Sequence, residues 1–195
     1  MSAQLKTKLT AEEYLAIERK AERKSEFYDG EMFLMAGATR EHNLIVTNVV
    51  RELSNQLKGK PCETYPSDMR VRVPATETYT YPDVVVVCDE PQFDDKEFDT
   101  LLNPTLIIEV LSRSTASYDK GGKFAHYRTI ESLKEYVVVA QNRYEIEHHA
   151  KQADGRWVLT DVRGLERKVE LESINCALDL REVYERVELS QAERG

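Results

Sequence analysis

Several features are scarce in this 195-residue sequence, and each scarcity excludes a class of protein. No apolar run approaches the roughly 20 residues needed to cross a bilayer, so no membrane partner is expected. The first residues, Met-Ser-Ala-Gln-Leu-Lys, lack the basic and then apolar layout of a secretory signal. The cysteines Cys62, Cys88 and Cys176 are odd in number and far apart. This spacing argues against a disulfide framework and a cysteine-based zinc site, and it indicates a reducing, cytoplasmic compartment.

Positive charge is also scarce, because 27 Lys and Arg residues stand against 35 Asp and Glu residues, for a net charge of −8. Nucleic-acid binding draws affinity from basic side chains that neutralise phosphates, so this charge counts against it unless bound cations or a local basic rim compensate. The sequence has no Walker A loop, Rossmann glycine pattern or G-x-S-x-G elbow. It also has no internal repeat, low-complexity tract or linker, which predicts a single domain over residues 1–195 with a core at about 9–187.

Two local signals near the N-terminus predict a helix followed by a β-hairpin. Thr10 and Glu13 have the spacing of a capping box, in which each side chain accepts a hydrogen bond from a backbone amide at the start of a helix. Residues 25–35 form two extended halves around Asp29-Gly30, a dipeptide that accepts positive φ.

Apolar periodicity predicts the next elements. Residues 39–57 predict a second helix, because apolar side chains recur there at helical spacing and share one stripe with a histidine. The stripe consists of His42, Val46, Val49, Val50, Leu53 and Leu57. Residues 62–73 predict a strand, and the acidic stretch 89–103 predicts an exposed loop or a short helical segment.

Two uninterrupted apolar runs, 83–88 and 106–111, predict strands that are buried on both faces at the centre of a mixed sheet. Further strands are predicted at 133–140, 144–150, 156–162 and 168–171, and further helices at 117–130 and 178–187. The predicted fold class is therefore α/β (α+β), with a mixed β-sheet flanked by helices and an N-terminal helix and hairpin.

Each central strand carries one carboxylate, Asp83 at the head of the first and Glu109 inside the second. Burying an ionised carboxylate is costly unless it is paired, well hydrogen-bonded or bound to a cation. A divalent metal between the two would remove this cost and could activate water for phosphodiester hydrolysis. The alternative is structural, with Asp83 capping a strand after Pro82 and Glu109 pairing with an arginine or lysine.

Three further residues are candidates for the same site. Glu26 and Glu31 flank the turn of the hairpin, where either could complete a metal shell or position water, although both could also be solvated surface charges. His42 could be a metal ligand for Mn²⁺ or Mg²⁺ or a histidine satisfied in the core.

A lysine pair follows the central strands. Lys123 shares a helix face with Tyr127 and Ile130, so its ammonium is predicted to point inward, where it could stabilise negative charge on a phosphate. Lys120 lies on the same face one turn earlier, and either lysine could instead cover apolar surface with its stem. The neighbouring histidines 148 and 149 point to opposite faces of a strand, so they are not predicted to share one metal ion.

The ordered set of these residues resembles the PD-(D/E)xK superfamily of restriction-endonuclease-like folds, and more narrowly its Uma-type branch of restriction endonucleases. The resemblance covers roughly residues 9–187, and the order of the pieces is more specific than any single piece. The matching pieces are Ser25-Glu26-Phe27-Tyr28-Asp29-Gly30-Glu31, His42, Tyr81-Pro82-Asp83-Val84, Glu109-Val110-Leu111-Ser112, Tyr118-Asp119-Lys120-Gly121-Gly122-Lys123, Tyr127 and Leu133-Lys134-Glu135-Tyr136.

The resemblance implies a divalent metal, Mg²⁺ or Mn²⁺, held by Asp83, Glu109 and the carbonyl of Val110, and hydrolysis of DNA phosphodiesters. It also implies a homodimer, because these folds often pair and double-strand cleavage needs two sites. The superfamily carries a lysine two residues after the glutamate, where this sequence has Leu111. The Uma-type branch commonly has a lysine on the following helix instead, and the matching residue is Lys123.

These features leave three hypotheses. The leading one is a Mg²⁺- or Mn²⁺-dependent DNA endonuclease. The second is a binding module that keeps the nuclease fold without cutting, which Leu111 and the acidic composition favour. The third is a phosphoesterase acting on small nucleotides, for which a low positive charge is no handicap.

Overall fold

The computed structural model describes residues 8–111 and 118–189, with the side chains of 118–120 left out. Its helices are α1 (Ala11–Glu18), α2 (Arg40–Leu57), α3 (Phe124–Tyr127) and α4 (Leu180–Val183), with single turns η1 (Pro74–Thr76), η2 (Tyr118–Lys123) and η3 (Glu172–Ile174). Its strands are β1 (Ser25–Tyr28), β2 (Glu31–Leu34), β3 (Cys62–Pro66), β4 (Arg70–Val73), β5 (Thr78–Thr80), β6 (Val84–Cys88), β7 (Thr100–Leu101), β8 (Leu106–Leu111), β9 (Glu135–Ala140), β10 (Glu145–Lys151), β11 (Trp157–Arg163), β12 (Lys168–Leu171) and β13 (Cys176–Asp179).

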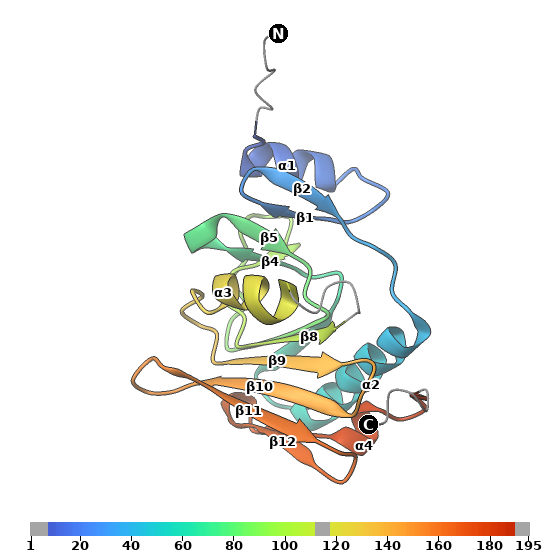
Figure 1. The fold of residues 1–195 in the computed structure, drawn as a ribbon. Helices are drawn as coiled ribbons and strands as arrows, with labels where there is room; N and C mark the ends of the chain where they lie inside the picture. Colours follow the sequence, from blue (N-terminus) through green and yellow to red (C-terminus); the bar gives the residue numbers. More distant parts are fainter. Residues whose placement is uncertain (1–7, 112–117, 190–195) are drawn as a thin grey trace.

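The strands form two large sheets with helices around them, as Figure 1 shows. One has five strands in the order β2-β1-β5-β4-β7, and the other has six in the order β11-β10-β9-β8-β6-β3. Strands β12 and β13 make a separate antiparallel pair. Because β8 pairs antiparallel with β6 and parallel with β9, the six-stranded sheet is mixed. The predicted α+β class with a mixed sheet is confirmed.

The N-terminal helix and hairpin form as predicted. Thr10 accepts a hydrogen bond from the Glu13 amide, and the Glu13 side chain accepts one from the Thr10 amide, which completes the capping box. Both residues of the Asp29-Gly30 turn have positive φ, and β1 pairs with β2 on either side of it. Helix α1 covers one face of the hairpin, where the ring of Tyr14 stacks on a phenylalanine of β1 at 4.8 Å.

The two central strands are buried on both faces, as their uninterrupted apolar runs predict. On one side of the six-stranded sheet, Val84 and Val86 of β6 pack in the same cluster as Ile45 and Val49 of α2. On the other side, Val85 and its neighbours pack with residues of β4, β7 and α3, and Figure 1 shows α3 lying between the two sheets. Glu109 lies on β8, and Asp83 directly precedes β6. The burial of these two strands on both faces therefore determines where the two carboxylates lie.

Three sequence predictions about elements are wrong. The predicted strand at 62–73 divides at a turn after Pro66 into β3 and β4, which belong to different sheets. The predicted loop at 89–103 contains the buried strand β7, which pairs with β4. The predicted helix at 178–187 begins instead as β13, and α4 is only four residues long.

The third predicted helix, at 117–130, is present in part. It begins with the π-helical turn η2 and continues as α3 to Tyr127, while its predicted start at Ser117 lies outside the described residues, as does Ser112. Strand β5, which sequence patterning missed, joins the hairpin to β4. No helix within residues 8–111 and 118–189 is long and apolar enough to span a bilayer.

The expectation that the cysteines form no disulfide framework is wrong, because Cys62 and Cys88 form a disulfide, while Cys176 is a free cysteine. The two residues are 26 positions apart in the sequence, but they are directly opposite each other in the antiparallel pairing of β3 with β6. Separation along the chain was therefore the wrong measure of distance. The cysteines no longer argue for a reducing compartment.

The two neighbouring histidines of β10 point to opposite faces, as predicted. His148 contacts Glu135 through Nε2 at 2.8 Å, whereas the His149 ring lies 4.4 Å from that of Phe124 on the other face. Glu135 also accepts hydrogen bonds from Ser173, so it ties β9 and β10 to the segment around η3. This cluster joins elements of the fold and lies apart from the carboxylates of the central strands.

Candidate functional site

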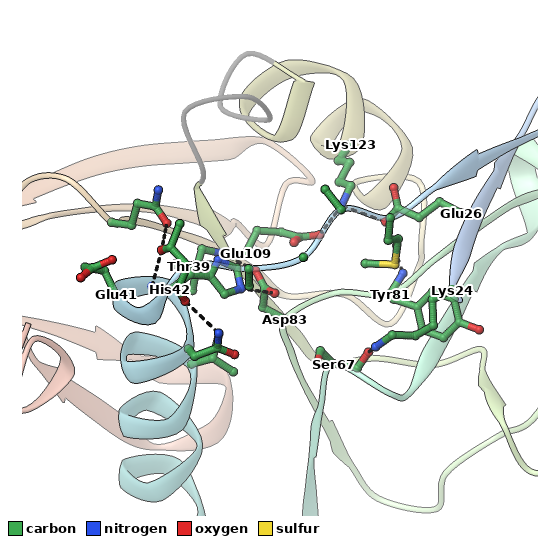
Figure 2. A pocket seen from close by; sticks show the side chains of 18 of the residues that line it. Lys24, Glu26, Thr39, Glu41, His42, Ser67, Tyr81, Asp83, Glu109 and Lys123 are labelled. Carbon is green, nitrogen blue, oxygen red and sulfur yellow. Dashed lines mark hydrogen bonds and ion pairs between the residues drawn. The ribbon is translucent and has the colours of Figure 1, made fainter. Parts of the chain in front are cut away.

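A cleft of about 1230 Å³ opens where the hairpin, the start of α2 and the central strands meet. Its walls come from the β1–β2 hairpin, residues 35–39, the first turns of α2, the residue before β6 and the C-terminal half of β8. Figure 2 shows Glu26, His42, Asp83, Glu109 and Lys123 around this cleft. The cleft therefore gathers residues from distant parts of the sequence, from Arg23 to Leu189.

Asp83 is held in place from two sides. Its Oδ2 accepts a hydrogen bond from the Val110 amide at 2.7 Å, which joins the start of β6 to β8. Its Oδ1 lies 3.0 Å from Nε2 of His42. His42 reaches this position because Thr39 caps α2 and accepts the His42 amide hydrogen bond at 3.2 Å, which fixes the first turn of the helix.

Glu109 lies deeper, with only 4% of the residue exposed. Its Oε1 accepts hydrogen bonds from Nζ of Lys123 at 3.2 Å and from the hydroxyl of Tyr127 at 2.9 Å. The Tyr127 hydroxyl also lies 2.9 Å from Oγ1 of Thr80. Complete burial, and then the negative charge of Glu109, raise the pKa of Tyr127 well above its ordinary value. Tyr127 therefore stays protonated and remains a hydrogen-bond donor to Glu109.

Lys123 links two carboxylates that come from different sheets. Its Nζ lies 2.9 Å from Oε1 of Glu26 and 3.2 Å from Oε1 of Glu109. The residue is 8% exposed, which confirms the prediction that Lys123 points inward. Glu26 is oriented in turn by the amide of Tyr81, which lies 3.4 Å from the same carboxylate oxygen. The result is a buried cation between two acids, in the lining of the cleft that also contains Asp83 (Figure 2).

The structure brings together every residue named as a site candidate from the sequence except two. Glu26, His42, Asp83, Glu109, Val110 and Lys123 all line the cleft. Glu31 is exposed at the turn end of β2 and does not line it. The side chain of Lys120 lies outside the described residues.

The sequence alone does not show two contributors to the site. It places Tyr127 on the inward face of its helix but does not reveal its contact with Glu109. It does not single out Thr80, because its apolar pattern does not reveal β5. The run of threonine and tyrosine at residues 78–81 was an available signal, because both residue types favour strands.

Oxygen donors gather at this cleft. Asp83 and Glu109 would offer carboxylate oxygens, the main-chain carbonyl of Val110 a further oxygen, and His42 an imidazole beside Asp83. Within residues 8–111 and 118–189, no group of three or more His, Cys, Asp or Glu side chains is arranged to hold a metal ion by itself. Mg²⁺ commonly binds through one or two carboxylates and keeps several waters. The residues therefore suit an open site that water and substrate complete.

Comparison with known proteins gives the family of this chain. A family model with the description "Uma2: Putative restriction endonuclease" matches residues 11–181. The chain belongs to the Uma2 family. It is 43% identical to the uncharacterized Synechocystis protein sll1609 over 162 residues, which cover 83% of this chain and 92% of that protein. It is 36% identical to the Synechocystis protein slr1290 over 177 residues, which cover 91% of this chain and 92% of that protein.

A solved structure supports the fold of this Uma2 chain. It is described as a "putative nuclease belonging to DUF820 from Anabaena variabilis", with a TM-score of 0.74 and 14% sequence identity. The match covers 90% of this chain and 97% of that chain. At this identity the likeness shows that the two chains share a fold.

In this Uma2 chain a lysine from another segment contacts the glutamate of the central strand. Leu111 lies two residues after Glu109 and packs into the apolar cluster between the sheets. Side chains two apart on a strand share a face, so Leu111 is on the side of β8 from which Lys123 approaches. Lys123, at the end of η2, therefore contacts the Glu109 carboxylate on the same face of β8 that carries Leu111.

Proposed function

We propose that this Uma2-family protein is a divalent-metal-dependent endonuclease that hydrolyses phosphodiester bonds of DNA. The observation that carries the proposal is the convergence of Asp83, Glu109 and Lys123 on one cleft. Two carboxylates and one ammonium match the charge pattern of hydrolysis at a phosphate, where a cation must be held and developing negative charge must be stabilised.

In this proposal Asp83 and Glu109 would hold Mg²⁺ or Mn²⁺, with the Val110 carbonyl and His42 as further ligands. The bound metal would polarise a phosphoryl oxygen and lower the pKa of a bound water. The chain's own residues orient these groups. The Val110 amide fixes one oxygen of Asp83, and Tyr127 fixes one oxygen of Glu109.

Lys123 is proposed as the residue that stabilises negative charge on the scissile phosphate. Glu26 holds its ammonium at 2.9 Å, in the lining of the cleft. Lys120 remains an alternative for this role. Because folds of this type often pair, we propose that the protein works as a homodimer, and because its proposed substrate is DNA we place it in the cytoplasm.

DNA cleavage tests the proposal directly. Purified protein is incubated with supercoiled plasmid or with circular single-stranded DNA and Mg²⁺ or Mn²⁺, beside Asp83→Ala, Glu109→Ala and the control Asp161→Ala, whose side chain is 46% exposed on β11. We expect the first two variants to lose activity by at least about 100-fold, since loss of an outer-shell partner of a metal alone costs about 10- to 100-fold. The control keeps its activity. Equal cleavage by all variants, or none with any divalent cation, would refute the proposal.

One observation favours a second candidate, a binding module that does not cut. Lys123 and Tyr127 already bond Glu109, so the buried carboxylate is compensated without a metal. Calorimetric titration with Mn²⁺ separates the two candidates. Binding that disappears in Asp83→Ala supports the enzyme, whereas no binding to the wild-type protein favours the module.

A further inference from the structure

Phe33 is an aromatic residue that lines the cleft and belongs to none of the hydrophobic core clusters. It lies on β2, the edge strand of the five-stranded sheet, and pairs with Glu26 of β1. Residues directly opposite each other in an antiparallel pair share a face of the sheet, with roughly 5 Å between their Cβ atoms. Glu26 reaches Lys123 on that face, so Phe33 stands beside the charged network of the site.

The exposure of Phe33 does not follow from packing. Its neighbour Met32 points to the other side of the hairpin and packs against the cluster of Tyr14 and Phe27. Phe33 lines the cleft and is 49% exposed, and Leu34 beside it lines the cleft and is 55% exposed. Together they give the cleft an apolar rim on the hairpin side, next to the residues proposed to act on phosphate.

The charge of the cleft limits what kind of nucleic acid it can hold. Its described lining has three cationic side chains, Arg23, Lys24 and Lys123, against five carboxylates. Lys24 contacts Asp68 at 2.8 Å, and Lys123 lies between Glu26 and Glu109, so both charges are partly neutralised. A duplex presents one negative charge for about every 1.7 Å of its axis and is bound chiefly through neutralised phosphates. This lining offers a duplex little of that compensation.

A single strand makes different demands. Proteins that bind single strands place bases on aromatic side chains, a contact that tolerates any sequence because every base has a π-face. One exposed ring beside the site and an apolar rim correspond to this mode, and a single strand presents about one charge per 3.4 Å, half that of a duplex, so it needs fewer cations. We infer that Phe33 is a stacking platform for an unpaired nucleobase and that the cleft takes single-stranded DNA. The inference rests on the proposed nuclease function. It adds that the DNA is single-stranded and that Phe33 contacts its bases.

Binding measured without cleavage tests this inference. Fluorescence anisotropy of the full-length protein is recorded in Ca²⁺ with three fluorescein-labelled probes: a mixed-sequence single strand, an abasic strand of the same length and the corresponding duplex. The variants are Phe33→Ala and Phe33→Trp. Phe98→Ala is the matched control, because Phe98 is 64% exposed and lies outside the cleft lining.

We expect the wild-type protein to bind the single strand more tightly than the abasic strand or the duplex. Phe33→Ala should weaken binding of the single strand about tenfold and leave the abasic strand almost unchanged, since one stacking contact is lost. Phe33→Trp should retain the affinity, and Phe98→Ala should match the wild type. Few neutralised phosphates also predict a shallow salt dependence, with a log–log slope smaller in magnitude than about 2.

The inference is overturned if Phe33→Ala binds all probes as the wild type does, if it weakens the base-containing and abasic strands equally, or if the wild-type protein binds no probe. Sedimentation of the same variants adds a further check, because a change in mass for Phe33→Ala would make the residue a subunit contact instead. Cleavage in Mg²⁺ keeps the two proposals distinct. Phe33-dependent binding without cleavage would refute the nuclease alone, and cleavage that needs Asp83 but shows no Phe33-dependent binding would refute the platform alone.

Discussion

Replacing Lys123 by methionine tests the electrostatic account of the site more directly than replacing either carboxylate. Methionine keeps the apolar stem but removes the ammonium that lies 2.9 Å from Glu26 and 3.2 Å from Glu109. Two acids from different sheets would then face each other without the cation between them. Lys123→Met should therefore destabilise the fold as well as reduce activity.

The magnitude follows from burial. The side chains of Lys123, Glu26 and Glu109 are 9%, 16% and 5% exposed, so water screens them little. Removing one partner of a buried ion pair costs about 3–5 kcal/mol, because it leaves a buried charge without compensation. We expect about 3 kcal/mol, at the lower end, since Glu26 keeps some contact with solvent. For a chain of this size that corresponds to a fall in Tm of about 6–12 °C.

The assay is calorimetric unfolding in metal-free buffer at pH 7. Lys168→Met is the control, because Lys168 is 64% exposed in its ion pair with Glu170 and should leave Tm unchanged. The double variant Lys123→Met/Glu109→Gln should recover at least half of the loss, since one of the two uncompensated charges is gone.

Two outcomes would contradict this reasoning. A Tm for Lys123→Met within about 2 °C of the wild type would mean that the ammonium does not compensate the carboxylates, since it corresponds to 1 kcal/mol or less. A double variant whose loss equals the sum of the two single losses would mean that the lysine and Glu109 act independently.

Two further predictions concern the rest of the fold. Cys88→Ser, which opens the 26-residue loop closed by the disulfide with Cys62, should lower stability by about 3 kcal/mol. Dithiothreitol should lower the Tm of the wild type and not of this variant, and an unaffected wild type would contradict the prediction. Burial raises the pKa of Glu135, but hydrogen bonds from His148 and Ser173 outweigh it and hold the pKa below the ordinary 4.5. The stabilisation is thus present above pH 4.5 and lost as the pH falls below it, so Glu135→Gln should flatten the acid side of the Tm–pH profile, and an unchanged acid side would count against it.

Local signals in the sequence predicted the elements whose boundaries depend on neighbouring residues. The capping box at Thr10 and the Asp29-Gly30 turn are of this kind, because a few adjacent atoms determine them. The two central strands were also predictable, since burial on both faces leaves an uninterrupted apolar run. The carboxylates Asp83 and Glu109 could be singled out for the same reason.

Pairing between distant segments could not be predicted in this way. The alternation of Val71 and Val73 with arginines shows which faces are buried, but it does not show that β4 belongs to another sheet than β3. The partner of Cys62 depended on the register of β3 with β6, which no local pattern specifies. Lys123 could be predicted to point inward, but its position between Glu26 and Glu109 is a product of the tertiary fold.

The origin of the site residues in two sheets has a consequence for how such a site can vary. Glu26 comes from the five-stranded sheet and Glu109 from the six-stranded one, and Lys123 reaches both from the turn between them. A substitution that shifts the hairpin would move Glu26, which contacts the Lys123 ammonium, and leave the carboxylates of the central strands in place. The position of the lysine ammonium and the positions of the carboxylates on the central strands can therefore change independently in this fold. This gives a physical reason why a lysine from another segment can contact a glutamate of the central strand when that strand carries no lysine itself.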